Sequence, residues 1–126
     1  MSTVVHALRL VIVNGASFSE TITWTSNGTL VALPVGTIAE AKVRESVESS
    51  IVLLRFSTAP GATDGLIVLS DPGVTTLSLT PAKTALLTPI LDAVFDIKYT
   101  FAGGTVIMKL VDGKGRVDIL PAVTRP

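Results

Sequence analysis

Alternation of apolar and polar residues over short stretches is the feature that most limits what this chain can fold into. Residues 94–101 read VFDIKYTF, in which aromatic or aliphatic residues at every second place alternate with polar ones. A repeat of two places the apolar side chains on one face of a β-strand. Similar alternation occurs in residues 18–25, 105–111 and 116–120. These segments predict strands of a sheet with one buried face and one face in water.

The alternation also predicts which side chains face the core. In each segment the apolar members of the alternating set should lie on the buried face. They are Phe18, Ile22 and Trp24 in the first; Phe95, Ile97, Tyr99 and Phe101 in the second; Val106, Met108 and Leu110 in the third; and Val117 and Ile119 in the last.

Glycine-containing turns separate these apolar runs. They occur around Asn27-Gly28, Asp64-Gly65, Asp71-Pro72-Gly73, Gly103-Gly104 and Asp112-Gly113. Short turns of this type favour antiparallel pairing of successive strands. The predicted strands are 8–13, 18–25, 39–45, 51–57, 66–70, 75–79, 94–101, 105–111 and 116–120. Seven to nine short strands predict an all-β fold, an antiparallel β-sandwich of immunoglobulin-like or jelly-roll-like type, with residues 1–126 as a single domain.

One segment departs from the strand pattern. Residues 81–87 begin with Pro81, which is favoured at the first helical position, and Thr80 before it is a suitable N-cap. Pro89 should end the segment because proline lacks the next backbone donor and restricts the residue before it. We expect one short helical turn near 81–87 that crosses between sheets.

The composition indicates a surface with few charges. Hydrophobic residues make up 48% of the 126 residues and charged residues only 16%, whereas about a quarter is usual. Either some apolar surface faces a partner, or threonine and serine supply an uncharged polar exterior. The formal net charge is zero and no basic stripe is present, which argues against nucleic acid as a partner.

Residues for catalysis or metal binding are sparse. Cysteine is absent and His6 is the only histidine, so we predict no zinc site and no Ser-His-Asp arrangement. Glu40, Glu45 and Glu48 fit a solvated edge better than a pair of acid-base carboxylates. No segment has the composition of a membrane-spanning helix or a signal peptide. We therefore expect a non-enzymatic protein with no cofactor, no membrane contact and no small-molecule substrate.

Four segments taken in order carry a family resemblance. They are NGASFSETITWTSNG (14–28), AEAKVRES (39–46), LIVLSDPGVTTLSLTPAKTALL (66–87) and AVFDIKYTFAGGTVIMKLVDGKGRVDILPAVTR (93–125). This succession resembles a family of small bacteriophage virion proteins of the tail, collar and fibre-attachment type, whose sequences close on a V-T-R motif. The link before residue 94 is longer here than is usual in that family, and Ala16 stands where an acidic residue is common.

The resemblance implies a β-sandwich located in the virion, present in many copies, that binds other virion structural proteins at the neck, tail or fibres. A capsid decoration protein and a host-receptor or carbohydrate-binding module are the alternatives. The apolar start of the chain and its ILPAVTRP ending predict that residues 1–7 and 121–126 act as assembly arms in a homo-oligomer. The predicted interface residues are Val4, Val5, Leu8, Leu120, Pro121, Val123 and Arg125.

Overall fold

The computed structural model describes residues 8–23, 25–26, 29–30, 32–70, 73–110 and 114–122. Its elements are β1 (Leu8–Val13), β2 (Phe18–Thr23), β3 (Thr25–Ser26), β4 (Thr29–Leu30), β5 (Ile38–Arg44), β6 (Leu54–Ser57), β7 (Gly65–Ser70), β8 (Val74–Leu79), α1 (Pro81–Thr84), β9 (Ile90–Thr100), β10 (Val106–Lys109) and β11 (Gly115–Leu120). Each of the nine predicted strands corresponds to one of these strands. The predicted all-β class is therefore confirmed.

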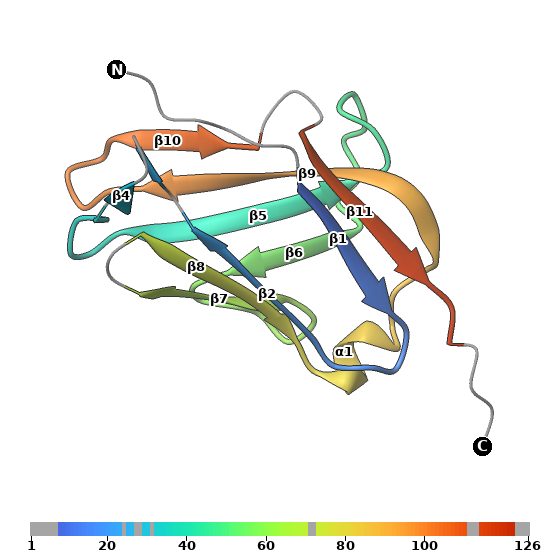
Figure 1. Ribbon diagram of the computed structural model, residues 1–126. Helices are drawn as coiled ribbons and strands as arrows, with labels where there is room; N and C mark the ends of the chain where they lie inside the picture. The colour runs from blue at the N-terminus through green and yellow to red at the C-terminus, as the bar shows by residue number, and fades with distance from the viewer. Residues whose placement is uncertain are drawn as a thin grey trace.

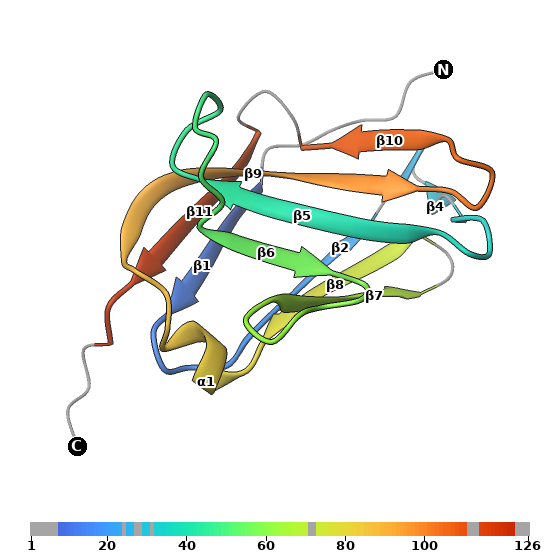
Figure 2. The ribbon, with the colours of Figure 1, turned by 180° about the vertical axis from the view of Figure 1, so that it is seen from behind.

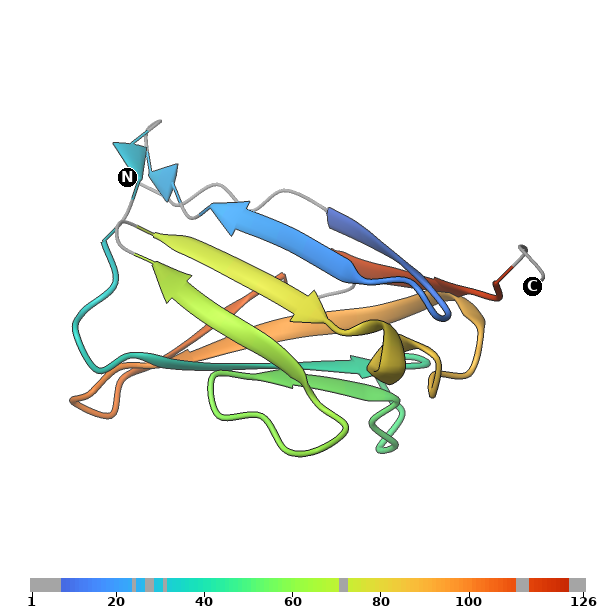
Figure 3. The same cartoon turned by 90° about the horizontal axis from the view of Figure 1, so that it is seen from below.

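A single nine-stranded sheet wraps almost completely around the core. The strand order is β1-β11-β9-β5-β6-β7-β8-β2, with β10 paired to the other end of β9. The consecutive strands β1 and β2 lie at the two ends of this order, where they are not hydrogen-bonded to each other. Viewed from below, β2, β8 and β7 lie on one side of the core and β9, β5 and β6 on the other (Figure 3). β3 and β4 form a separate two-stranded sheet.

Two pairs of strands are parallel, which corrects the purely antiparallel sheet predicted from the short turns. β1 runs parallel to β11 from Leu8↔Gly115 to Val13↔Leu120, so the two arrows point the same way (Figure 1). β6 and β7 are also parallel, over two residue pairs. The turn signals predict the antiparallel pairs β7–β8 and β9–β10 correctly, but they fail for β6 and β7, which follow each other directly and run parallel. They carry no information on β1, which pairs with the last strand of the chain.

The predicted core faces are largely confirmed. Phe18, Phe95, Ile97, Tyr99, Val117 and Ile119 are all buried, and Ile22 and Phe101 are half-buried against them. Trp24 lies outside the described residues. The inner faces of β1, β5, β6 and β8 complete the core with Leu10, Ile12, Ala41, Val43, Leu54, Phe56 and Leu77.

The prediction of which β10 side chains face the core is wrong for Val106 and Met108. Val106 and Met108 are 53% and 42% exposed, whereas Leu110 is buried. The three residues would share a face in a regular strand. Leu110 instead takes a positive φ of 60° just beyond the end of β10, and this turns its side chain inward.

Many strand boundaries differ from the prediction by one or two residues, and the starts of two strands differ by more. β6 begins at Leu54 rather than at 51, and Ile51 is an exposed loop residue. β9 begins at Ile90 rather than at 94, because a register shift opposite Val117 and Ile119 lets the strand continue around Asp92. Asp92 has a φ of 62°, a conformation that aspartate tolerates better than most residues. Residues 90–93, which precede the predicted strand, thus form the irregular start of β9.

The short helix is confirmed, although it ends earlier than predicted. α1 covers Pro81–Thr84, with Pro81 in the first turn and the Thr80 side chain accepting a hydrogen bond from the Lys83 amide. Turns continue the path to residue 87. The Asn14 side chain donates to the carbonyls of Thr84 (2.7 Å) and Leu87 (2.9 Å), and the Thr84 hydroxyl donates to the Ala16 carbonyl. These bonds fix α1 to the β1–β2 turn.

A buried hydrogen bond joins opposite sides of the sheet. The hydroxyls of Thr75 on β8 and Tyr99 on β9 are 2.7 Å apart, and both residues are almost fully buried. Burial raises the pKa of Tyr99, and the hydrogen bond to Thr75 opposes part of that rise. The phenol therefore stays protonated at neutral pH.

Removal of this bond has a measurable cost. We expect Tyr99→Phe to lower the free energy of unfolding by about 1–2 kcal/mol, because a buried threonine hydroxyl loses a partner. Chemical denaturation of Tyr99→Phe, Thr75→Val and the double variant should give a coupling energy of about 1 kcal/mol. Additive effects of the two substitutions would contradict this assignment.

Candidate assembly surfaces

The structure describes three of the seven predicted interface residues. Leu8 is half-buried and packs against the core, Leu120 is half-buried and Pro121 is exposed. Val4, Val5, Val123 and Arg125 lie outside the described residues. Leu8 pairs with Gly115 at one end of the β1–β11 ladder, whereas Leu120 pairs with Val13 at the other. The ladder therefore places Leu8 and Leu120 about 16 Å apart, at its opposite ends.

A network of four charged side chains fastens β1 to its neighbours. Arg9 on β1 contacts Asp118 on β11 at 2.9 Å and Asp92 on β9 at 2.8 Å. Arg116 lies 3.4 Å from Asp92, and the Asp92 amide donates to the Asp118 carboxylate at 2.8 Å. The hydrogen bond from Arg9 lowers the pKa of Asp92 despite partial desolvation, and the charge of Arg116 lowers it further.

Sequence reasoning did not find this network. Arg9 interrupts the apolar start of the chain, and Asp118 alternates with the core residues of β11. A parallel pair between the first and last strands was needed to bring them together.

The network makes stability dependent on pH in the acid range. Because the pKa of Asp92 is lower in the folded state, its contribution is fully present above the ordinary aspartate pKa of about 3.9 and is lost as the pH falls through the folded value. We expect the melting temperature of Asp92→Asn to approach that of the wild type as the pH falls from 6 towards 2.5. Asparagine also tolerates the positive φ at this position. A constant difference between the two proteins across this range would contradict the assignment.

The outer face of β2, β8 and β7 carries no charged side chain. Its nine outward residues form three rows across the strands: Ser19-Ser78-Leu66, Thr21-Thr76-Val68 and Thr23-Val74-Ser70. We call these nine residues the uncharged face. Leu66 and Val68 are 39% and 46% exposed, and the hydroxyls of Thr21 and Thr76 are 3.5 Å apart. Threonine, serine and exposed aliphatic residues thus occur together on this face.

The opposite face, on β5, β6 and β9, is charged. Glu40 pairs with Arg55 and, at 3.4 Å, with Lys42, while Lys98 and Asp96 also point outward from β9. Exposed Ile38, Val106 and Met108 lie at its β10 margin. The two faces therefore differ in charge, and only the uncharged face can lie against an uncharged surface without desolvating ionised groups.

A groove lined by both polar and apolar side chains lies beside α1. It has a volume of about 360 Å³ and is lined by Val52, Leu53, Leu54, Arg55, Thr63, Asp64, Lys83, Leu86 and Leu87. We call it the α1 groove. Leu86 is 70% exposed at its edge, and Val52 and Leu53 are 39% and 37% exposed. Lys83 donates to the Asp64 carbonyl at 2.6 Å, which holds the helix to the β6–β7 loop.

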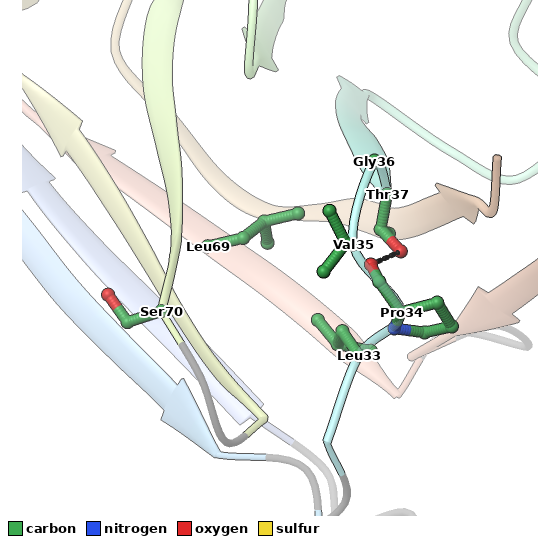
Figure 4. A pocket seen from close by; sticks show the side chains of 7 residues that line it. All are labelled: Leu33, Pro34, Val35, Gly36, Thr37, Leu69 and Ser70. Atoms are coloured by element: carbon green, nitrogen blue, oxygen red, sulfur yellow. Dashed lines mark hydrogen bonds between the residues drawn. The ribbon is translucent and has the colours of Figure 1, made fainter.

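A smaller pocket of about 220 Å³ lies between the loop before β5 and the end of β7 (Figure 4). Leu33, Val35 and Leu69 supply its apolar lining, and the Thr37 hydroxyl donates to the Pro34 carbonyl at 2.6 Å. The residues that line it include no acid, base or nucleophile with an activating partner. The pocket is therefore a small hollow whose lining residues are not suited to catalysis.

Other candidate sites give little support for catalysis. Glu40 is held in surface ion pairs, Glu45 and Glu48 are exposed, and His6 lies outside the described residues. Among the described residues, no three acidic or histidine side chains gather as metal ligands. Of the helices in the same part of the chain, none has the length and apolar character needed to cross a membrane.

No family model matches the chain, and a search of curated proteins finds no match. Among solved structures, the crystal structure of the ZIG-8–RIG-5 IG1–IG1 heterodimer in its monoclinic form is similar to 89% of this chain and 81% of that chain. The TM-score is 0.46 and 10% of the aligned residues are identical.

Proposed function

We propose that this protein is a non-enzymatic structural component of a bacteriophage virion, present in many copies, that connects other virion proteins at the neck, tail or fibres. The observation that carries the assembly role is the uncharged face. Nine outward side chains without a charge, on three adjacent strands, form a surface that can be buried at low desolvation cost. The virion setting is inferred from the resemblance over residues 14–28, 39–46, 66–87 and 93–125.

The two ends of the β1–β11 ladder support this role. Contact surfaces at opposite ends of a subunit favour head-to-tail association, which closes into a ring when the rotation between neighbours permits. The finer description of the fold that fits this role is an immunoglobulin-like β-sandwich. In this description β10, β11, β9, β5 and β6 form one layer, and β7, β8 and β2 form the other, as their positions in Figure 2 suggest.

A sugar-binding or receptor-binding module is less well supported. Such sites commonly present aromatic side chains to the ligand. Within the described residues, Phe18, Phe56, Phe95 and Tyr99 are buried and Phe101 is half-buried. These aromatic side chains pack in or against the core.

The native mass of the purified protein tests the assembly role. We expect a mass several times the 13.1 kDa of one chain, and a ring of about six or twelve copies for a neck or tail component. Thr76→Lys, at the centre of the uncharged face, should reduce this mass, because a buried lysine requires a partner. Thr100→Lys is the matched control, since Thr100 is also half-buried but points outward from β9 on the charged side. A wild-type protein of 13.1 kDa at all concentrations would contradict homo-oligomeric assembly.

Analysis of purified phage particles tests whether the protein is part of the virion. The protein should be detected in purified virions of the phage that encodes it, in many copies per particle. A copy number fixed by the symmetry of the tail would indicate the neck or tail, whereas one that follows the number of capsid subunits would indicate decoration of the head. Absence from purified particles would contradict the proposal.

A further inference from the structure

β10 has one edge to which no strand of the described chain is paired. It lies off the continuous strand order and pairs with β9 only, at the margin of the sheet (Figures 1 and 2). Just before β10, the Phe101 amide donates to the Thr105 carbonyl at 2.8 Å. Bonded and non-bonded residue pairs alternate along an antiparallel ladder, so Ile107 directs its backbone groups to β9. The amides and carbonyls of Val106 and Met108 therefore point away from β9, along the free edge.

The side chains beside this free edge are mostly apolar. Val106 and Met108 face outward and are 53% and 42% exposed. Ile38, which lies in the same row as Val106 across β9, is 58% exposed. Ile107 is half-buried on the opposite face of the strand. The only charge on β10 is that of Lys109, its last residue.

The free edge of β2 differs in this respect. β2 pairs with β8 only, and Glu20 lies on its core-facing side between Phe18 and Ile22. An inward-pointing charge in the middle of an edge strand opposes the addition of another strand. β10 has no such charge at its centre, so its edge is better suited to strand addition.

The sequence of β10 is complementary to itself across a two-fold axis. When two β10 strands pair antiparallel about Ile107, Val106 of each copy lies opposite Met108 of the other. The outward amides and carbonyls of these two residues then bond to each other. The exposed Val106 and Met108 side chains cover one another, and the two Ile107 side chains meet on the opposite face. Lys109 falls opposite Thr105, so like charges do not face each other.

We propose that the free edge of β10 pairs antiparallel with β10 of a second copy of this chain. The nine-stranded sheets of the two copies then become continuous across a two-fold axis. Both copies use the same surface in such a contact, whereas a contact that closes a ring is head-to-tail. The inference therefore goes beyond the proposed function, and it depends neither on the uncharged face nor on the virion setting. In a protein that also forms rings, this contact joins subunits of two different rings.

Oxidation of an Ile107→Cys variant tests this contact. The chain contains no cysteine, so any disulfide joins two copies. At the two-fold axis the paired Cα atoms are about 4.5 Å apart, which is within the range that a disulfide spans. Under mild oxidation we expect about tenfold more covalent dimer from Ile107→Cys than from Ile22→Cys, because pairing raises the local concentration of the thiols. Ile22 is the matched control, since it is also a half-buried isoleucine on a strand with a free edge.

Met108→Pro gives a second measurement. Proline removes the amide donor that points outward and leaves the bonds from β10 to β9 in place, so an edge strand accepts it. We expect sedimentation experiments over a range of concentrations to show about tenfold weaker self-association than for the wild type. Met108→Ala keeps the amide and should weaken self-association less. Equal effects of the two substitutions would show that the backbone of this edge does not make the contact.

The remaining outcomes also separate this inference from the proposed function. Equal cross-linking of Ile107→Cys and Ile22→Cys would overturn the inference. An edge covered by another segment of the chain, or reserved for a different protein, would likewise leave purified Ile107→Cys without a covalent dimer. A multimeric native mass without this cross-link leaves the assembly role standing. A covalent dimer in a protein whose native mass does not respond to Thr76→Lys would support β10 pairing and contradict the role of the uncharged face.

Discussion

Gly115→Ala is expected to lower the free energy of unfolding by about 3 kcal/mol. A β-carbon at this position would lie 2.3 Å from the carbonyl oxygen of Phe95 and 2.9 Å from its ring. The obstructing atom belongs to the backbone of β9, so it cannot rotate away as the end of a side chain would. Relief requires β11 to separate from β9 at the place where Gly115 pairs with Phe95 on one side and Leu8 on the other.

Gly103→Ala is the matched control for this substitution. A β-carbon at Gly103 would meet no atom within 4 Å. We expect its unfolding free energy to remain within about 0.5 kcal/mol of the wild type in urea titrations. Equal stability of the two alanine variants would contradict the close approach of β11 and β9.

Phe56→Ala is expected to cost about 4 kcal/mol, because it leaves a cavity in the centre of the core. Phe56 is fully buried, and its ring centroid lies 6.1 Å from that of Phe18 in a tilted arrangement. The ring also covers Gly65, where an added β-carbon would lie 2.3 Å from one of its carbons. Gly65 therefore lacks a side chain because the Phe56 ring occupies that space.

A double-mutant cycle tests this explanation. Gly65→Ala alone should destabilise the protein by about 2 kcal/mol through overpacking. In the Phe56→Ala background the same change should be nearly neutral, because the ring that it would meet is gone. The free energies of unfolding of the four proteins measure the coupling, and simple additivity would show that Gly65 is not constrained by the ring.

Most of the strands could be predicted from the sequence, because each strand has one buried face and one solvent-exposed face. β1 matches its predicted range of 8–13, and β11 differs from its range by one residue. Local chemistry also identified the helix, since Thr80 and Pro81 act within one turn. Patterns of this kind reflect neighbours in the chain and are visible without knowledge of the fold.

Features that depend on distant residues were not predictable. The outward facing of Val106 and Met108 depends on how β10 pairs with β9, and the early start of β9 depends on the turn at Asp92 against β11. Neither changes the apolar pattern around it. The uncharged face was foreseen only as a property of composition, because its three rows arise from the register of β2, β8 and β7.

The parallel pairing of β1 with β11 also sets the order in which the protein can fold during synthesis. β1 is made first, but its hydrogen-bonding partner is the last strand of the domain to leave the ribosome. Until then Leu10 and Ile12, which are fully buried in the finished protein, have no sheet to cover them. Arg9 likewise cannot form its ion pair with Asp118 until β11 has been made. The first strand is therefore the final one to be secured, and nascent chains that stop before residue 115 should present an uncovered apolar segment to chaperones.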